Sequence, residues 1–129
     1  MDEMMRTMAA SASGMAAQAA RLRLSSENIA NADTPGFRRK TVSFEEAFGR
    51  GDVRAVHTGP VRLDEAELVK VYDPSNPLAG PDGTYQGSNV NLVLEIADAR
   101  EANRSYEANL RMFDQARQMA SSLLGLLRR

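Results

Sequence analysis

The sequence contains no cysteine and no tryptophan, and His57 is its only histidine. Without cysteine the chain forms no disulfide, carries no thiolate zinc site and has no cysteine nucleophile. His57 lies in a short β-favouring run, with neither a second histidine nor a carboxylate at metal-ligand spacing, so we expect an exposed or purely structural side chain. We therefore expect no metal and no other cofactor.

Aromatic side chains are also scarce, because tyrosine and phenylalanine together make up 5% of the 129 residues. So few large side chains leave little volume for a globular core. Sixteen basic and seventeen acidic residues give a net charge of −1. This balance does not favour a polybasic surface of the kind that binds nucleic acid or anionic lipid, so we expect no nucleic-acid partner.

The usual sequence signatures of enzymes are missing. The glycines form neither a phosphate-binding loop nor a dinucleotide fingerprint, and there is no Gly-x-Ser-x-Gly elbow. The acidic segment 64–67 lacks the spacing of a calcium loop, so we expect a solvated loop. The first residues are acidic where a secretory signal is basic, which predicts a chain without a cleavable signal peptide. These absences favour a protein that is not an enzyme and has no small-molecule substrate.

The clearest positive feature is a helical pattern from Asn91 to Leu127. Apolar residues recur there at alternating spacings of four and three, the period of one coiled-coil seam. The seam positions are Leu92, Ile96, Ala99, Asn103, Tyr106, Leu110, Phe113, Arg117, Ala120, Leu124 and Leu127. We predict a helix about 50 Å long, capped at its start by Asn91, and hence an elongated molecule.

Two seam positions are polar, Asn103 and Arg117. One interpretation is that the apolar stripe precesses around the helix and leaves both residues at its edge. The other is that they fix register or partner choice, as buried polar residues do in coiled coils. The sequence leaves both interpretations open.

A second seam occupies the N-terminal region from Met1 to about Ile29. Its positions are Met1, Met5, Met8, Ala12, Met15, Ala19, Leu22, Ser26 and Ile29. Alanine and methionine permit close helix approach but bury less apolar area than a leucine seam. Serine and glycine at positions 11, 13 and 14 lower the helix propensity further. We therefore expect this helix to be ordered mainly when it packs on a partner.

A turn motif follows the first helix. Pro35 disfavours helical backbone at Thr34, and Gly36 can take the positive φ of a type II turn. The motif residues are Asn28, Asn31, Thr34, Pro35, Gly36 and Phe37. The basic run 38–40 comes next, and we expect a solvated turn there rather than a specific anion site.

The middle of the chain has β-favouring runs at Val53–Thr58 and Glu67–Tyr72, which predict a hairpin. The sequence does not decide between helix and extended structure for 42–48, and it predicts a turn-rich loop at 73–91. The predicted fold is mainly α, with long N- and C-terminal helices packed as an antiparallel coiled-coil-like pair and a short β-hairpin and loop excursion between them. Residues 1–33 and 91–129 are expected to form a discontinuous helical core domain, and 34–90 the turn motif, β-hairpin and extended loop.

Several of these segments together resemble a known family. Ser13-Gly14, Asn28-Ile29-Ala30-Asn31, the run from Thr34 to Lys40 and the heptad C-terminus resemble the axial proteins of the bacterial flagellum, specifically the rod proteins. The segments Val71-Tyr72-Asp73-Pro74 and Asn89-Val90-Asn91 are similar to a rod subunit. Asn76 departs from the family pattern, where histidine is usual, and so does 84–88.

The resemblance implies a structural subunit of the proximal rod without catalytic activity. Such a subunit is exported unfolded by the flagellar type III apparatus and polymerises in the periplasm with other copies and other rod subunits. The product is the drive shaft that transmits motor torque to hook and filament. An alternative that the residues leave open is a stand-alone coiled-coil adaptor or secretion chaperone that forms a small oligomer.

In either case the assembly interface is expected on the helical seams. The candidate interface residues are Met5, Met8, Met15, Leu22, Ile29, Leu92, Ile96, Asn103, Tyr106, Leu110, Phe113, Leu124 and Leu127.

Overall fold

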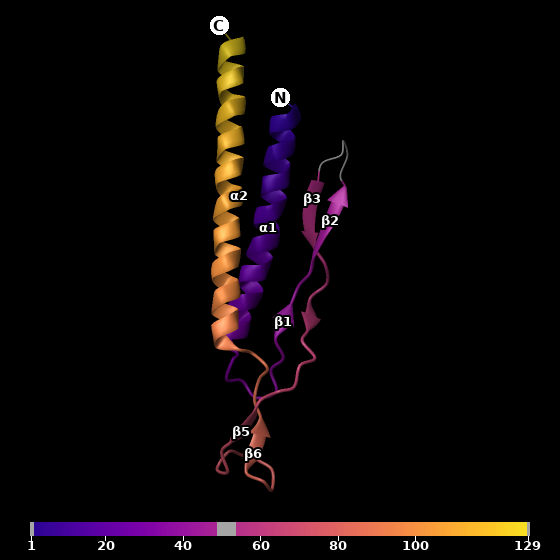
Figure 1. The fold of residues 1–129 in the computed structure, drawn as a ribbon, viewed down its shortest axis with the longest axis vertical. Coiled ribbons are helices and arrows are strands. Elements are labelled where there is room, and N and C mark those ends of the chain that lie inside the picture. Colours follow the sequence, from indigo (N-terminus) through magenta and orange to yellow (C-terminus); the bar gives the residue numbers. More distant parts are fainter. Residues whose placement is uncertain (1, 49–53, 129) are drawn as a thin grey trace.

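Two antiparallel helices dominate the computed structural model, which describes residues 2–48 and 54–128. Helix α1 comprises Asp2–Ala30 and helix α2 comprises Leu92–Leu127. They pack side by side (Figure 1), so the predicted mainly α fold with a helix pair is confirmed. The predicted cap is confirmed as well, because Asn91 Oδ1 accepts hydrogen bonds from the amides of Val93 at 3.1 Å and Leu94 at 3.4 Å. No described helix is both long enough and apolar enough to span a membrane.

Within the described residues, six short strands form three separate antiparallel pairs. Strand β1 (Lys40–Thr41) pairs with β4 (Arg62–Leu63), β2 (Phe44–Phe48) pairs with β3 (Arg54–Thr58), and β5 (Lys70–Tyr72) pairs with β6 (Thr84–Gln86). The predicted hairpin between 53–58 and 67–72 is therefore wrong in its pairing, although both segments contain a strand. Residue 53 itself lies outside the described residues.

The β2–β3 hairpin explains why the pairing differs. Pairing these strands lets β3 pack along α1, and Phe44 and Val56 line a hollow together with Ala10 and Gly14 of α1. The Val56 amide also donates a 3.1 Å hydrogen bond to the Ser13 hydroxyl of α1. Helix α1 thus lies between α2 and the hairpin (Figure 1), and the β5–β6 hairpin projects beyond the other end of the helix pair.

The buried positions of the two helices are mostly small or polar. On α2 they are Glu95, Ala102 and Ala116, each one residue before a predicted seam position. On α1 they are Ser11, Ala17, Leu24, Ser25 and Asn28, of which Ser11, Ser25 and Asn28 precede a seam position by one residue and Leu24 is the one large apolar side chain. Along each predicted seam, half-buried residues alternate with exposed ones, apart from the ends of α2. The contact between the two helices therefore covers only about every second residue of each predicted seam.

The helices are in close contact at Gly14. A Cβ placed on Gly14 would lie 2.8 Å from Asn109 Nδ2, so a larger side chain there would require the Asn109 side chain to shift. Small side chains let helices approach closely but bury little apolar area. Each Å² of buried apolar area stabilises a fold by roughly 25 cal/mol. The larger apolar side chains are thereby left near the edge of the contact.

Helix α2 extends past the start of α1 (Figure 1). The contacts of Asn28 with Glu95 and of Gly14 with Asn109 fix an antiparallel register in which Asp2 is level with Ser121. The segment 122–127 therefore has no helix of the described chain beside it. Its leucines are exposed, with Leu126 at 64% and Leu127 at 78%.

Candidate assembly site and polar junction

A buried polar cluster joins the end of α1 to the start of α2. Asn28 is fully buried and Glu95 is 1% exposed, and Asn28 Nδ2 donates a 3.0 Å hydrogen bond to Glu95 Oε1. Asn28 also bridges to the strand region, because its Nδ2 donates to the Lys40 carbonyl and its Oδ1 accepts from the Lys40 amide, both at 2.9 Å. We call Asn28, Arg39, Lys40, Asn89 and Glu95 the polar junction.

Arg39 neutralises the buried carboxylate of Glu95. Its Nε lies 2.7 Å from Glu95 Oε2, and its Nη2 lies 3.0 Å from Asp98 Oδ2. Burial of the guanidinium opposes its charge, but the hydrogen bond and charge of Glu95, with the charges of Asp98 and Asp64, outweigh that effect and raise the pKa of Arg39. The side chain therefore stays cationic within a compact ion cluster.

The expectation of a solvated basic turn at 38–40 is wrong, because all three side chains bind within the chain. Arg38 Nη1 donates to the carbonyls of Asp64 and Ala66, each at 3.2 Å. Lys40 Nζ lies 2.5 Å from Glu27 Oε1. The three adjacent cations of this run pair with acceptors on separate segments of the chain. The spacing of residues within the run does not indicate these partners. Only the carboxylates at positions 95 and 98, one helical turn apart, hint at a cation nearby.

The turn motif has the geometry that the sequence predicts. Gly36 has a φ of 75°, and the Phe37 amide donates to the Thr34 carbonyl at 3.2 Å, as in a type II turn with Pro35 exposed at its corner. Asn31 closes the helix end, because its Nδ2 donates to the Glu27 carbonyl at 2.9 Å. The Thr34 hydroxyl donates to Asn31 Oδ1 at 3.1 Å.

The turn also holds the segment that leads into α2. The Gly36 amide donates to the Gly87 carbonyl at 3.0 Å, and the Ser88 hydroxyl donates to the Ala32 carbonyl. Asn89 receives the Arg39 amide on Oδ1 at 2.6 Å and donates through Nδ2 to the Asp64 carbonyl at 2.9 Å. The motif therefore fixes where α2 begins relative to where α1 ends.

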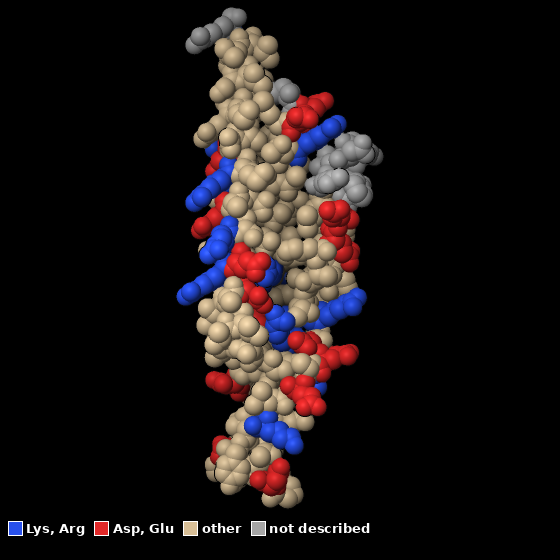
Figure 2. All heavy atoms as spheres, viewed as in Figure 1, with Lys and Arg blue, Asp and Glu red and all other residues tan. Residues whose placement is uncertain are grey.

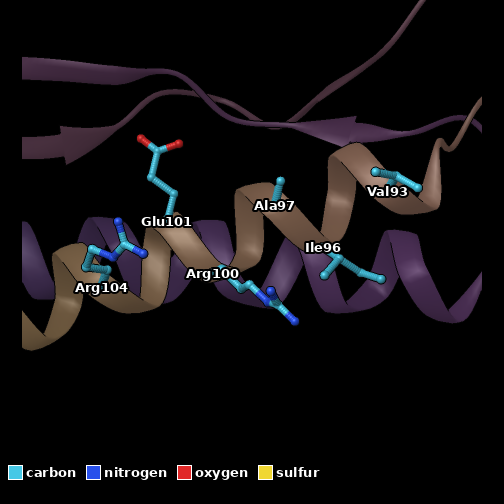
Figure 3. A pocket seen from close by; sticks show the side chains of 6 residues that line it. All are labelled: Val93, Ile96, Ala97, Arg100, Glu101 and Arg104. Carbon is cyan, nitrogen blue, oxygen red and sulfur yellow. The ribbon is translucent and has the colours of Figure 1, made fainter.

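The predicted seams lie together on one side of the helix pair. A step of one residue turns a helix by about 100°, and in antiparallel neighbours the same step turns both helices toward the same side. Figure 3 shows this for α2, where Ile96 and Arg100 point away from the strands while Ala97 and Glu101 point toward them. The seam side is thus opposite the β2–β3 hairpin.

We call this side the seam face. Its half-buried members, which border the contact between the helices, are Met8, Met15, Leu22, Ile29, Ala99, Tyr106, Phe113 and Ala120. Its exposed members are Met5, Ala12, Ala19, Leu92, Ile96, Asn103, Leu110, Arg117, Leu124 and Leu127. The structure therefore brings all the candidate interface residues together as one surface that no other described element covers.

Comparison with known proteins identifies the family. A family model described as flagella basal body rod protein matches residues 8–38, which include the turn motif. A second, described as flagellar basal body rod FlgEFG protein C-terminal, matches residues 82–126. The flagellar basal-body rod protein FlgC of Agrobacterium fabrum is 44% identical over 124 residues, covering 90% of this chain and 89% of that protein. This chain belongs to the FlgC family.

More distant FlgC proteins match over most of their length too. FlgC of Salmonella typhimurium is 33% identical, covering 88% of this chain and 90% of that protein. FlgC of Bacillus subtilis is 33% identical, covering 78% and 82%. This FlgC-family chain is thus a structural subunit of the flagellar basal-body rod, and the free-standing adaptor or chaperone is not favoured.

The two polar seam residues of this FlgC-family chain are both exposed. Asn103 lies on the seam face, and Arg117 makes one surface ion pair, with Asp114 at 3.7 Å. Neither side chain is buried between α1 and α2, so they do not set the register of that pair. Their part in contacts with other subunits stays a prediction.

A hollow of about 480 Å³ on the first turns of α2 is open and is lined by one helix alone (Figure 3), through Val93, Ile96, Ala97, Arg100, Glu101 and Arg104. Among residues 2–48 and 54–128 no three metal-binding side chains are grouped. His57 is exposed, with Nε2 3.2 Å from Glu45 Oε2 on the paired strand.

Proposed function

We propose that this chain polymerises through its seam face in the proximal part of the rod, where it transmits motor torque to hook and filament. The observation that carries the proposal is the exposure of large apolar side chains along one face of the helix pair, with Ile96 at 44%, Leu110 at 40% and Leu124 at 44%. Contiguous exposed apolar surface of this kind marks protein contacts.

The composition of the intramolecular seam supports polymerisation. Fixing each residue of a helix costs about 1–2 kcal/mol of conformational entropy, and a seam of alanine, serine and glycine recovers little of it. Burial of the seam face against neighbouring subunits supplies the missing apolar contact. A subunit of this type completes its folding as it assembles.

The small apolar area buried between α1 and α2 also suits export before assembly. A chain with a small core unfolds readily, which agrees with passage through the flagellar type III apparatus without a cleavable signal peptide. The proposed location is the part of the basal body within the periplasmic space. The proposed partners are other copies and other rod subunits, with no substrate, cofactor or nucleic acid.

Replacement of Leu110 by glutamate tests the proposal. A charge on the seam face loses an apolar contact and places a carboxylate in a desolvated interface, at a cost of about 2–3 kcal/mol for each contact. We expect cells that carry Leu110→Glu to assemble at least tenfold fewer rods, counted in electron micrographs of purified basal bodies, and to lose swimming.

The matched control is Arg111→Glu, which changes the charge at the next residue, outside the seam face. It should leave rod number within twofold of the natural chain, and both variants should show unchanged helicity by circular dichroism. Normal rod assembly by Leu110→Glu would contradict the proposed function.

A further inference from the structure

The side of the helix pair opposite the seam face carries a groove. A hollow of about 310 Å³ between the start of α1 and the upper part of α2 is lined by Glu3, Met4, Thr7, Met112, Gln115, Ala116 and Met119. It continues through Thr7 and Met112 into a second hollow of about 410 Å³. Met112 and Met119 are 53% and 51% exposed, so the groove is open along the described chain.

The floor and walls of this groove suit an apolar ridge. The second hollow is lined by the small residues Ala10, Gly14 and Ala17 of α1 and by Phe44 and Val56 of the β2–β3 hairpin, with Gln18 and Asn109 among its polar side chains. Methionine walls are unbranched and adapt to the shape of the side chains they meet. The upper end of α2 carries no charge from Gln118 to Leu127 (Figure 2).

The seam face offers a ridge of matching chemistry. Leu110 and Leu124 are exposed along it, with Phe113 between them. Met112 lies two residues after Leu110 and Met119 lies five residues before Leu124, so groove and ridge are about 140–160° apart around α2. A copy therefore cannot fill its own groove with its own ridge, but a neighbour in the same orientation can.

Charge complementarity indicates how two copies align. Glu3 is the carboxylate that lines the groove, and Arg117 is a cation on the ridge. In the register of the helix pair Glu3 is level with Ala120, about one turn from Arg117. Neighbours standing side by side with only a small axial shift would therefore bring Arg117 of one copy to Glu3 of the next.

We propose that the seam face of one copy docks into the methionine-lined groove of the next copy, with Arg117 opposite Glu3 of that copy. This inference rests on the proposed function and names the surface that the seam face meets. Because ridge and groove are different surfaces, the contact is heterologous and repeats from copy to copy, as a helical tube requires. It assigns Arg117 a part in partner choice.

Cysteine cross-linking in assembled rods tests the contact directly, because the natural chain has no cysteine. The double variant Leu110→Cys with Met112→Cys carries one thiol on the ridge and one in the groove, on different sides of α2. After mild oxidation of purified basal bodies we expect a ladder of disulfide-linked multimers in denaturing gels. Each single variant should remain monomeric.

The single variants distinguish the other arrangements. Cross-linking of Leu110→Cys alone would show that two seam faces meet each other, and cross-linking of Met112→Cys alone would show that two grooves do. Either result, or assembled rods in which the double variant does not cross-link, would overturn the proposal. The seam face would remain the assembly surface in the first case, so the proposed function would stand.

A charge exchange tests the pairing of Arg117 with Glu3. Arg117→Glu and Glu3→Lys should each lower rod number severalfold, because each places like charges opposite one another, and the double variant should restore most of the loss. Arg111→Glu is the control. Failure of the double variant to recover, in chains of normal helicity, would show that these two side chains do not meet.

Discussion

At the scale of single residues, the ion pair of Arg39 with Glu95 is the feature with the largest expected energy. The carboxylate of Glu95 has almost no access to water, and removal of its cation leaves a buried charge unpaired. Loss of one partner of a buried pair destabilises a fold far more than the intact pair stabilises it. The polar junction therefore holds the two helices in register. The free-energy cost of burying its charges is offset only while both partners of the ion pair are present.

We predict that Arg39→Ala lowers the free energy of unfolding by about 3 kcal/mol, the low end of the range for such a loss because Arg39 itself is partly exposed. Urea denaturation monitored by circular dichroism measures the change. Glu95→Gln is the control, since a neutral amide retains an acceptor for Asn28 and removes the buried charge. It should lower the free energy of unfolding by only about 1 kcal/mol. Equal effects of the two variants would contradict this role of Arg39.

At the scale of the elements, local chemistry determined what the sequence could predict. Helix α2 followed from its periodicity and its Asn91 cap, and the type II turn followed from Pro35 with Gly36. Two results depend on tertiary contacts instead. The strand pairing is selected by packing of β2–β3 on α1. Which residues are buried between α1 and α2 depends on how the two helices meet, and these are mostly small or polar instead of the large apolar residues that define the sequence pattern.

The candidate site shows the same division. The large residues of the seam face could be predicted from their spacing of four and three. The spacing did not indicate which half of them the partner helix would cover. The polar junction could not be found in full, because Asn28, Arg39 and the segment that contains Asn89 and Glu95 are separated in the sequence. Only folding brings these residues together, and their spacing in the sequence does not indicate that they meet.

The overhanging end of α2 yields a prediction at this scale. Removal of 123–129 deletes exposed leucines that lie beyond the start of α1, so the thermal midpoint of the isolated chain should change by less than about 2 °C. Assembly should be lost, because the upper end of the seam face is missing. Melting by circular dichroism and rod counts by electron microscopy separate the two effects. A truncated chain that still forms normal rods would show that this end of α2 is not an assembly surface.

At the scale of the whole molecule, stability should be uneven along the elongated helix pair. One end is fixed by the polar junction and the turn motif, while the other contains the alanine and methionine part of α1 and the overhang of α2. Local opening takes place where buried apolar contacts are few. In the unassembled subunit, the termini should open while the junction stays closed.

Hydrogen exchange of the dilute monomer tests this uneven stability. Amides of 2–10 and 117–127 should exchange at least a hundredfold faster than those of 24–30 and 95–102, as measured by mass spectrometry of peptic fragments. Uniform protection along both helices, with cooperative melting and protease-resistant ends, would contradict a subunit that completes its folding in the assembly.

A cryo-electron microscopy map of the purified basal body would show whether the subunit assembles through the seam face. With the chain traced in the rod, Ile96, Leu110 and Leu124 should be buried against neighbouring subunits. A map in which these side chains face solvent or the central channel, while subunits meet through other surfaces, would contradict assembly through the seam face.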